Sequence, residues 1–501
     1  MRIGQMRSGF WVVAAAILLV LGGRANATER EYERYSVVLI NDQRVGFSRE
    51  SGTVIDDTLV TSTEMILRIA RFDDELRVSV VTEFVETLDG EPISMRSTTD
   101  MGGSETTEAY VWKGERVIHT TINGGRRTVR EEEAPGGTWL TPGEVSEFVN
   151  ARVEAGAEKI VYSTIDASTG LERVLNKLTR EGTQEIESLG ETVNAVRWTV
   201  VQSIMPDLKM VNFTDEHGDT LRSEMPFGGL NMVMVRSSRE EALKEVPAME
   251  VMGSTLVKPK GTIESPRTSR RAVYLLSSAI AGQELPDFPS TGSQRVEKLE
   301  NGTLRVTIDL DAPLEIDDQE AVDERYTRST TTADSSDEAV RALVKRALSG
   351  VADDATDAAK AEAMRRFVFR FITDKQLGIG FASASQVAQN PAGDCTEHAV
   401  LLAAMLRAAG IPSRGVNGLI FVDQFGSGEE VFGYHMWAQA LVTDEQGRLV
   451  WKDFDPSWPT TMDATHITTS VTDLADDSML DSYTNIARLL GVLAIEVEEV
   501  E

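Results

Sequence analysis

The stretch from Gly393 to Arg414 reads Gly-Asp-Cys-Thr-Glu-His-Ala-Val-Leu-Leu-Ala-Ala-Met-Leu-Arg-Ala-Ala-Gly-Ile-Pro-Ser-Arg, and it decides the fold of the C-terminal part of the chain. It contains Cys395, the single cysteine among 501 residues. A Gly-Asp turn precedes Cys395, and an apolar run follows it and stops at Gly410, with a proline just beyond. This pattern predicts a helix that begins at Cys395, with Asp394 as its N-cap.

A cysteine in the first turn of a helix has two interpretations. The unpaired backbone N–H groups and the positive end of the helix dipole favour the thiolate, which is the nucleophilic form of cysteine. Alternatively, Cys395 is a small apolar residue of the core. The start of the helix alone does not decide between a reactive and a structural cysteine.

Two later stretches favour the reactive interpretation. His435 opens a strand-like run, and a second such run ends in Asp453-Phe454-Asp455-Pro456. The polar segment between the two runs predicts a hairpin with its centre near residues 445 and 446, which brings His435 level with Asp455 and Pro456. The register is a hypothesis, since a slip of one residue moves a side chain to the other face. The expected set is a nucleophile, a base and a carboxylate that orients the base.

These motifs resemble the transglutaminase-like (papain-like) superfamily over about residues 335–475. Gly-Asp-Cys at a helix start, His-Met-Trp-Ala on a strand and Asp-Phe-Asp-Pro-Ser-Trp at the end of the next strand follow the family order of Cys, His and Asp. The resemblance implies an α+β catalytic domain with a papain/transglutaminase-like fold, in which the nucleophile helix packs on an antiparallel sheet. It also implies that Cys395 is the nucleophile, His435 the base and Asp455 the orienting residue.

Other residues near these motifs are less favoured as site residues. His398 lies on the same helical face as the cysteine, and a structural role is preferred because a base on another element has better geometry. Asp453 is the second candidate for the orienting carboxylate. Gln386 and Gln389 are interpreted as structural, and the backbone N–H of Cys395 is the preferred oxyanion donor. No role is assigned to His466.

The expected chemistry is attack of the thiolate on an amide carbonyl of a protein or peptide, which releases an amine and leaves a thioester. Water then completes hydrolysis, as in a peptidase or amidase, whereas an amine completes transamidation; hydrolysis is favoured for an exported protein. No cofactor is expected. Cys395, His435 and Asp455 could bind zinc, but no further Cys/His pairing supports a metal site. The alternative function is an inactive scaffold whose β-rich half binds proteins or glycans.

Residues 1–27 have the pattern of a signal peptide, with a basic start, an apolar run from Phe10 to Leu21 and Ala25-Asn26-Ala27 before the expected cleavage point. The protein is therefore expected to be exported, to the periplasm or beyond the cell. The rival interpretation is an uncleaved anchor. No later stretch is long and apolar enough to span a bilayer, so no integral membrane segment is expected after cleavage.

The remaining sequence predicts a β-rich N-terminal domain (28–256), a small middle β unit with linkers (257–334), the catalytic domain (335–475) and an acidic, solvated C-terminal tail (476–501). The net charge is −30, and loss of three arginines with the signal peptide makes it −33, from 47 basic and 80 acidic residues. Such a charge argues against nucleic acid as a partner. One cysteine allows no intramolecular disulfide. The oligomeric state cannot be read from the sequence.

Overall fold

The computed structural model describes residues 31–501, except for residues 72–73, 168, 228, 251–255, 317–322, 376–381, 426–428, 476–485 and 487. The expected signal peptide, residues 1–27, lies outside the described residues, as does much of the expected acidic tail. Among the helices that the structure describes, none is long and apolar enough to cross a membrane. The chain divides into two compact units, residues 1–250 and 251–501.

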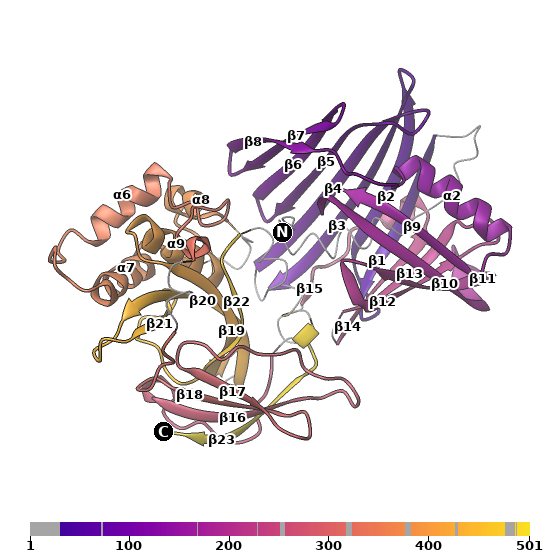
Figure 1. Ribbon diagram of the computed structural model, residues 1–501. Helices are drawn as coiled ribbons and strands as arrows, with labels where there is room; N and C mark the ends of the chain where they lie inside the picture. The colour runs from indigo at the N-terminus through magenta and orange to yellow at the C-terminus, as the bar shows by residue number, and fades with distance from the viewer. Residues whose placement is uncertain are drawn as a thin grey trace. The chain divides into compact units, whose positions relative to one another are not determined.

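The first unit is built mainly of strands, which are β1 (Tyr32–Ile40), β2 (Gln43–Ile55), β3 (Thr58–Arg71), β4 (Asp74–Thr87), β5 (Pro92–Met101), β6 (Ser104–Lys113), β7 (Arg116–Asn123), β8 (Arg126–Glu133), β9 (Lys159–Asp166), β10 (Gly170–Ser188), β11 (Glu191–Gln202), β12 (Met205–Thr214), β13 (Thr220–Phe227), β14 (Leu230–Ser237) and β15 (Met249–Glu250). The strands β1 to β14 form one sheet in the order β8-β7-β6-β5-β4-β3-β2-β1-β14-β13-β12-β11-β10-β9, and β15 pairs with β3; Figure 1 labels these strands. Every pair is antiparallel except that of β15 with β3. The expected β-rich character of the N-terminal region is confirmed.

Tight turns of residues with positive φ join the long strands. Asn41 and Asp42 link β1 to β2 with φ of 48° and 63°, and Asp56 and Asp57 link β2 to β3 in the same way. Two successive residues with positive φ make a turn whose twist matches that of the flanking strands. Between β7 and β8, Asn123 pairs with Arg126, and the turn residues Gly124 and Gly125 have φ of 56° and 79°.

The helix α2 (Pro142–Glu154) lies within the region that the sequence predicted to be β-rich. Thr141 and Glu144 form a capping box at its start, with a proline at the first helical turn, which is a recognisable helix signal. A shorter helix, α3 (Arg239–Ala242), follows β14. The strands of the first unit are thus interrupted by helices at positions where the sequence contains residues that start helices.

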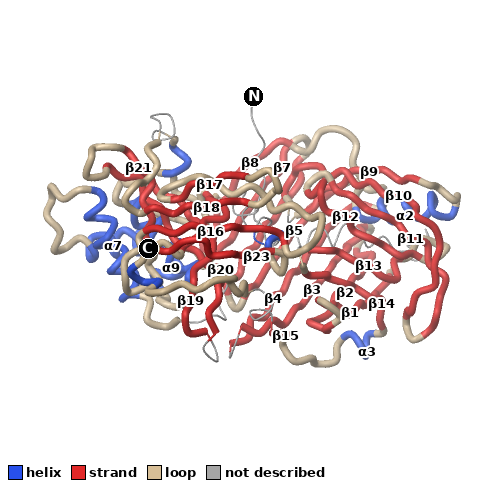
Figure 2. Tube along the Cα trace, turned by 90° about the horizontal axis from the view of Figure 1, so that it is seen from below, coloured by secondary structure: helices blue, strands red, loops and turns tan. Residues whose placement is uncertain are grey.

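The second unit contains the helices α6 (Glu338–Ala347), α7 (Asp357–Phe371), α8 (Ala384–Gln389) and α9 (Cys395–Ala408), the 3₁₀ turns Pro266–Thr268 and Glu324–Tyr326, and the strands β16 (Arg271–Ser278), β17 (Gln294–Lys298), β18 (Leu304–Asp309), β19 (Ser413–Phe425), β20 (Glu429–Thr443), β21 (Leu449–Phe454), β22 (His466–Thr472) and β23 (Leu493–Val500). The strands form two antiparallel sheets, β21-β20-β19-β22 and β17-β18-β16-β23. Figure 2 shows these strands and helices of the second unit in another view. The side chains of Asp337 and Thr356 cap the starts of α6 and α7.

Among the described residues of the second unit, the two larger apolar cores hold its helices and sheets together. In the first, α9 is buried on nearly all sides, between α6, α7 and α8 and the C-terminal half of β20. A helix that is apolar around its whole circumference needs such cover on every side. The nucleophile helix therefore packs on an antiparallel sheet, as expected. In the second core, residues of β19, the start of β20 and β22 pack against β16, β18 and β23.

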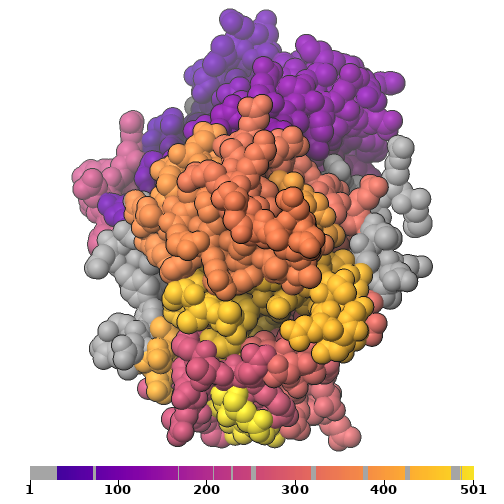
Figure 3. Space-filling model, turned by 90° about the vertical axis from the view of Figure 1, so that its left-hand side faces the viewer, coloured from indigo at the N-terminus to yellow at the C-terminus, as the bar shows by residue number. Residues whose placement is uncertain are grey.

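The prediction of a solvated C-terminal tail is wrong for residues 493–500. They form β23, which pairs with β16 from Ala272↔Val500 to Ser278↔Leu493. Leu493 and Ile495 are buried in the core between the two sheets, while glutamates on the same strand face outward. The acidic composition conceals this alternation, since only one face of the strand is apolar. Figure 3 shows the C-terminal residues in yellow beside the pink residues of the strands around β16.

Candidate active site

The first turn of α9 is held by a capping box. Oδ1 of Asp394, the N-cap, accepts a hydrogen bond from the backbone N–H of Thr396 at 2.8 Å. Oε2 of Glu397 accepts in return from the backbone N–H of Asp394 at 2.9 Å. Cys395 is the first residue of the helix, and its own N–H is not used by this cap. Cys395 therefore lies at the N-terminal end of the helix, which carries a partial positive charge.

Gly393 explains why glycine precedes the cap. Its φ is +142°, and a Cβ built there would lie 2.4 Å from Cγ of Glu397. The glutamate folds back over this position, where its Oε1 also accepts from the backbone N–H of Ala382 at 3.0 Å. Burial, and then the neighbouring Asp394, raise the pKa of the Glu397 carboxyl well above its ordinary value. The Gly-Asp-Cys motif thus follows from the geometry of the helix start.

His435 lies on β20, and Asp455 immediately follows β21. The pairs run from Ala438↔Phe454 to Thr443↔Leu449, so the hairpin has its centre at residue 446. Extension of this register places His435 level with Ser457, one or two residues beyond the expected partners. The two side chains meet nevertheless, because the chain leaves the ladder after Phe454 and turns back. Nε2 of His435 donates to Oδ2 of Asp455 at 2.8 Å.

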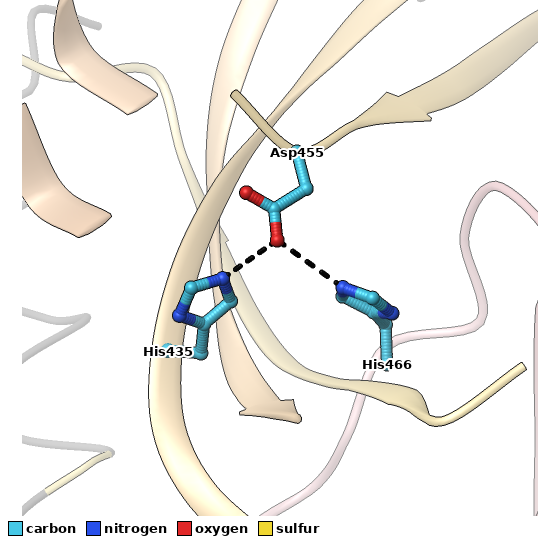
Figure 4. A group of neighbouring side chains, drawn as sticks. All are labelled: His435, Asp455 and His466. Carbon is cyan, nitrogen blue, oxygen red and sulfur yellow. Dashed lines mark hydrogen bonds and ion pairs between the residues drawn. The ribbon is translucent and has the colours of Figure 1, made fainter. Parts of the chain in front are cut away.

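The carboxylate of Asp455 is buried and accepts on both of its oxygens. Its Oδ1 accepts from the backbone N–H of Ser457 at 2.8 Å and from the hydroxyl of the same serine at 2.7 Å. Its Oδ2 accepts from two histidines, His435 and His466, which approach the oxygen from opposite sides (Figure 4). Burial opposes the charge, but the two histidines hold the pKa of the Asp455 carboxyl well below its usual range.

His435 stands between Asp455 and Cys395. Cys395 is near enough to interact with the ring of His435, and the use of Nε2 by Asp455 leaves Nδ1 for the sulfur. Burial would lower the pKa of His435, but the charges and hydrogen bonds of Asp455 and Cys395 outweigh burial and raise it to about 10. The structure therefore brings together all three residues predicted as the site.

The alternatives for base and orienting residue make other contacts. Nδ1 of His398 donates to the backbone oxygen of Asp394 at 2.6 Å, and burial lowers the pKa of this histidine. Oδ1 of Asp453 accepts from Nε1 of Trp437 and from Nε2 of Gln439, each at 2.8 Å. Gln386 belongs to the capping box of α8, where it accepts from the N–H of Ser383. These contacts agree with structural roles.

His466 is a member of this group that received no role from the sequence. It begins β22, where it pairs with Ile420 of β19. Its Nε2 donates to Oδ2 of Asp455 at 3.3 Å and its Nδ1 to Oδ1 of Asp463 at 3.1 Å. No motif marks it, because its position depends on strand pairing between segments about fifty residues apart.

His435, Asp455 and His466 place one ligand-type atom each within 4.8 Å of one another, a spacing that a metal ion could use. The atoms concerned are those of the hydrogen bonds described above, in which both Nε2 atoms face a single carboxylate oxygen. A shared acceptor between two ring nitrogens requires a proton on each nitrogen. These three residues therefore form a chain of hydrogen bonds, and we do not assign them a role as metal ligands.

Residues 341–456 match the family model of the transglutaminase-like superfamily core. The second unit contains a transglutaminase-like domain. The match spans Cys395, His435 and Asp455 and ends directly after Asp455, so His466 and Asp463 lie beyond the matched residues. None of the curated proteins matches the chain at a significant level.

Two solved structures give weaker likenesses. A β-barrel-like protein of the domain of unknown function DUF1849 from Brucella abortus is 12% identical, with a TM-score of 0.32, and the match covers 41% of this chain and 95% of that protein. The periplasmic domain of TgpA from Pseudomonas aeruginosa, bound to ethylmercury, is 15% identical, with a TM-score of 0.27, and the match covers 41% of this chain and 89% of that one. Scores at this level carry no inference about the activity of the transglutaminase-like domain.

Proposed function

We propose that the transglutaminase-like domain is a cysteine peptidase or amidase with Cys395 as nucleophile, His435 as base and Asp455 as the residue that orients the base. The observation that carries this proposal is the position of His435, whose Nε2 binds the Asp455 carboxylate at 2.8 Å while its ring interacts with Cys395. Nucleophile, base and orienting group joined in this way are the requirement for covalent catalysis by a thiolate.

In the proposed reaction, the Cys395 thiolate attacks the carbonyl carbon of an amide in a protein or peptide. The oxyanion that forms accepts a hydrogen bond from the N–H of Cys395, at the positive end of α9. His435 gives its Nδ1 proton to the leaving amine, and a thioester remains on Cys395. His435 then takes a proton from water as the water attacks the thioester, which releases the acid and restores the thiol–imidazole or thiolate–imidazolium pair.

Hydrolysis is proposed over transamidation, and export is proposed for the whole protein. Water at high concentration is the default acceptor of an acyl group in an extracytoplasmic space, and residues 1–27 have the order of a signal peptide. N-terminal sequencing of the mature protein should find a start near Thr28. A fluorescent primary amine offered with a glutamine-containing protein separates the two reactions: hydrolysis releases a shortened or deamidated product, whereas transamidation incorporates the dye.

The test of the proposed function is alkylation of Cys395, which is the only thiol of the chain. Iodoacetamide should label the protein near neutral pH much faster than it labels a free thiol, and His435→Ala should abolish the difference. Profiling of an extracytoplasmic proteome with intact protein and with Cys395→Ala would then reveal its substrates. If Cys395 in the folded protein reacts no faster than a free thiol, the inactive-scaffold alternative is favoured.

A further inference from the structure

The ring of His466 lies between two carboxylates. Nε2 is 3.3 Å from Oδ2 of Asp455, and Nδ1 is 3.1 Å from Oδ1 of Asp463. The backbone oxygen of Asp463 is a second acceptor for Nδ1, at 3.2 Å. A neutral imidazole has one donor nitrogen and one acceptor nitrogen, whereas the imidazolium donates from both. Since only acceptors face the two ring nitrogens, the contacts require the charged form of His466.

Asp463 is held so that it stays ionised beside this ring. Its Oδ1 also accepts from the backbone N–H of Thr465 at 3.0 Å and from the hydroxyl of the same threonine at 2.6 Å. Its Oδ2 accepts from Nη1 of Arg267 at 2.9 Å. The Asp463 side chain is fully buried and that of His466 is 1% exposed, so water can stabilise neither charge. Buried charges persist only when they are paired in this way.

The result is a series of groups of alternating charge: Arg267, Asp463, His466, Asp455, His435 and the thiolate form of Cys395. Hydrogen bonds described above join each neighbouring pair from Arg267 to His435, and the ring of His435 interacts with Cys395. Its outer half lies outside the residues that match the transglutaminase-like core. The centroids of the His435 and His466 rings are 6.2 Å apart, so the two imidazolium charges repel each other across the carboxylate that they share.

We propose that His466, charged through its contact with Asp463, is a positioning residue that fixes the carboxylate of Asp455 and makes it a weaker base toward His435. This inference rests on the proposed function and adds a residue to its site. The charge of His466 attracts the electron pair of Oδ2 that His435 also uses. The imidazolium of His435 therefore releases its proton more readily than it would beside Asp455 alone. His466 thus sets the pH above which the reactive thiolate–imidazolium pair is lost.

Other charged groups around the series act less directly. Lys375 donates from Nζ to the backbone oxygen of Ser457 at 3.2 Å and lies near enough to Asp455 to interact with its charge. Asp453 acts on His466 at longer range, and burial raises the pKa of its carboxyl. Trp437 packs edge-on against His466, with ring centroids 5.4 Å apart. A role for His466 in packing alone is therefore the alternative that the experiment must separate.

The test uses the full chain and compares iodoacetate, an anion, with iodoacetamide, which is neutral. The imidazolium of His435 attracts the anion. The ratio of the iodoacetate rate to the iodoacetamide rate therefore falls as His435 loses its proton. In His466→Gln the side-chain amide can still donate to Asp455 but carries no charge, and in Asp463→Asn the ring loses the partner that keeps it charged. In both variants this fall should move upward by about one pH unit. His466→Phe, which keeps a ring but no donor, should lower the iodoacetamide rate at neutral pH about tenfold or more.

The matched control is His217→Gln, in the first unit, where the histidine side chain is 43% exposed; this variant should leave the profile unchanged. If His466→Gln and Asp463→Asn fold but the fall in the rate ratio stays in place, the proposal is overturned. Should these variants not fold, ¹⁵N NMR of the unaltered protein decides, because the chain has only five histidines. His466 should keep protons on both ring nitrogens at pH 7, and a neutral ring there would overturn the proposal. If the proposed function itself were wrong, Cys395 of the unaltered protein would not be alkylated fast. That result is distinct from the two outcomes that overturn the role of His466.

Discussion

Tyr274 of β16 packs edge-on against Phe432 of β20, with ring centroids 5.6 Å apart and planes at 85°. Both rings are fully buried, and the hydroxyl of Tyr274 donates to the backbone oxygen of Ala464 at 3.1 Å. The strands before the transglutaminase-like domain and the sheet of that domain therefore share one core. This sharing bears directly on which part of the chain can fold alone.

A fragment that begins near Thr332, just before the expected catalytic domain, should not fold, because it lacks part of the shared core. Removal of β16, β17 and β18 exposes Phe421, Phe432 and other apolar residues of the second core. Each large buried side chain contributes about 1.5–3 kcal/mol, and the loss of several is comparable with the whole stability of a domain, roughly 5–15 kcal/mol. A fragment of residues 257–501 should show a cooperative thermal transition by circular dichroism. A similar transition in residues 332–501 would contradict the prediction.

Gly393→Ala should destabilise the start of the nucleophile helix. The new methyl group meets Glu397 at 2.4–2.5 Å, and φ of +142° is strained for any residue with a side chain. Backbone strain of this kind costs about 1–3 kcal/mol, and displacement of the glutamate adds the loss of its two backbone hydrogen bonds. The expected result is a lower melting temperature together with slower alkylation of Cys395.

Gly410→Ala is the matched control for that change. Its φ is +83°, so the strain remains, but no atom lies within 4 Å of the added methyl group. The cost should be about 1 kcal/mol, with no change in the reactivity of Cys395. Equal effects of the two substitutions on alkylation would show that the Glu397 contact is not needed at the helix start.

The sequence predicted those features of the site that depend on local pattern. Gly393, Asp394 and Gly410 mark the ends of one helix, and alternating apolar residues mark the strands that carry His435 and lead to Asp455. The hairpin register was missed by one or two residues, because the exact centre of a five-residue turn is not encoded in its composition. His466 was missed for a different reason. Its partners are set by the pairing of β22 with β19 and by Arg267, which is nearly two hundred residues away.

Stability should fall as the pH rises from about 6.5 toward 9. His466 has its pKa raised to about 9, because its hydrogen bonds to Asp455 and Asp463 outweigh the effect of burial. Below pH 6.5 the histidine is protonated in both the folded and the unfolded chain, and its contribution is complete. Between the two values the folded chain binds a proton that the unfolded chain has lost, so the free energy of unfolding decreases with pH. Thermal melts across this range should show the decrease.

His466→Gln removes one source of this dependence. The melting temperature of the variant should therefore decline less steeply between pH 6.5 and 9 than that of the unaltered protein. His435, whose pKa is raised to about 10, still contributes a decline that extends to higher pH. Parallel curves for the two proteins would mean that His466 is not charged in the folded chain.

Asp455→Asn should make the charged form of His435 easier to lose and so weaken its support for the Cys395 thiolate. Loss of the carboxylate lowers the pKa of His435 by about one to three units, because Asp455 supplies both a charge and a hydrogen bond at 2.8 Å. Thiolate absorbance at 240 nm, which reports Cys395 alone in a chain with one cysteine, should decrease, and alkylation by iodoacetamide should slow roughly tenfold or more. Asp453→Asn is the matched control. This buried carboxylate lies two residues away and binds Trp437 and Gln439 rather than His435. Its loss should lower the melting temperature while the thiolate signal persists; loss of that signal would make Asp453 the orienting residue.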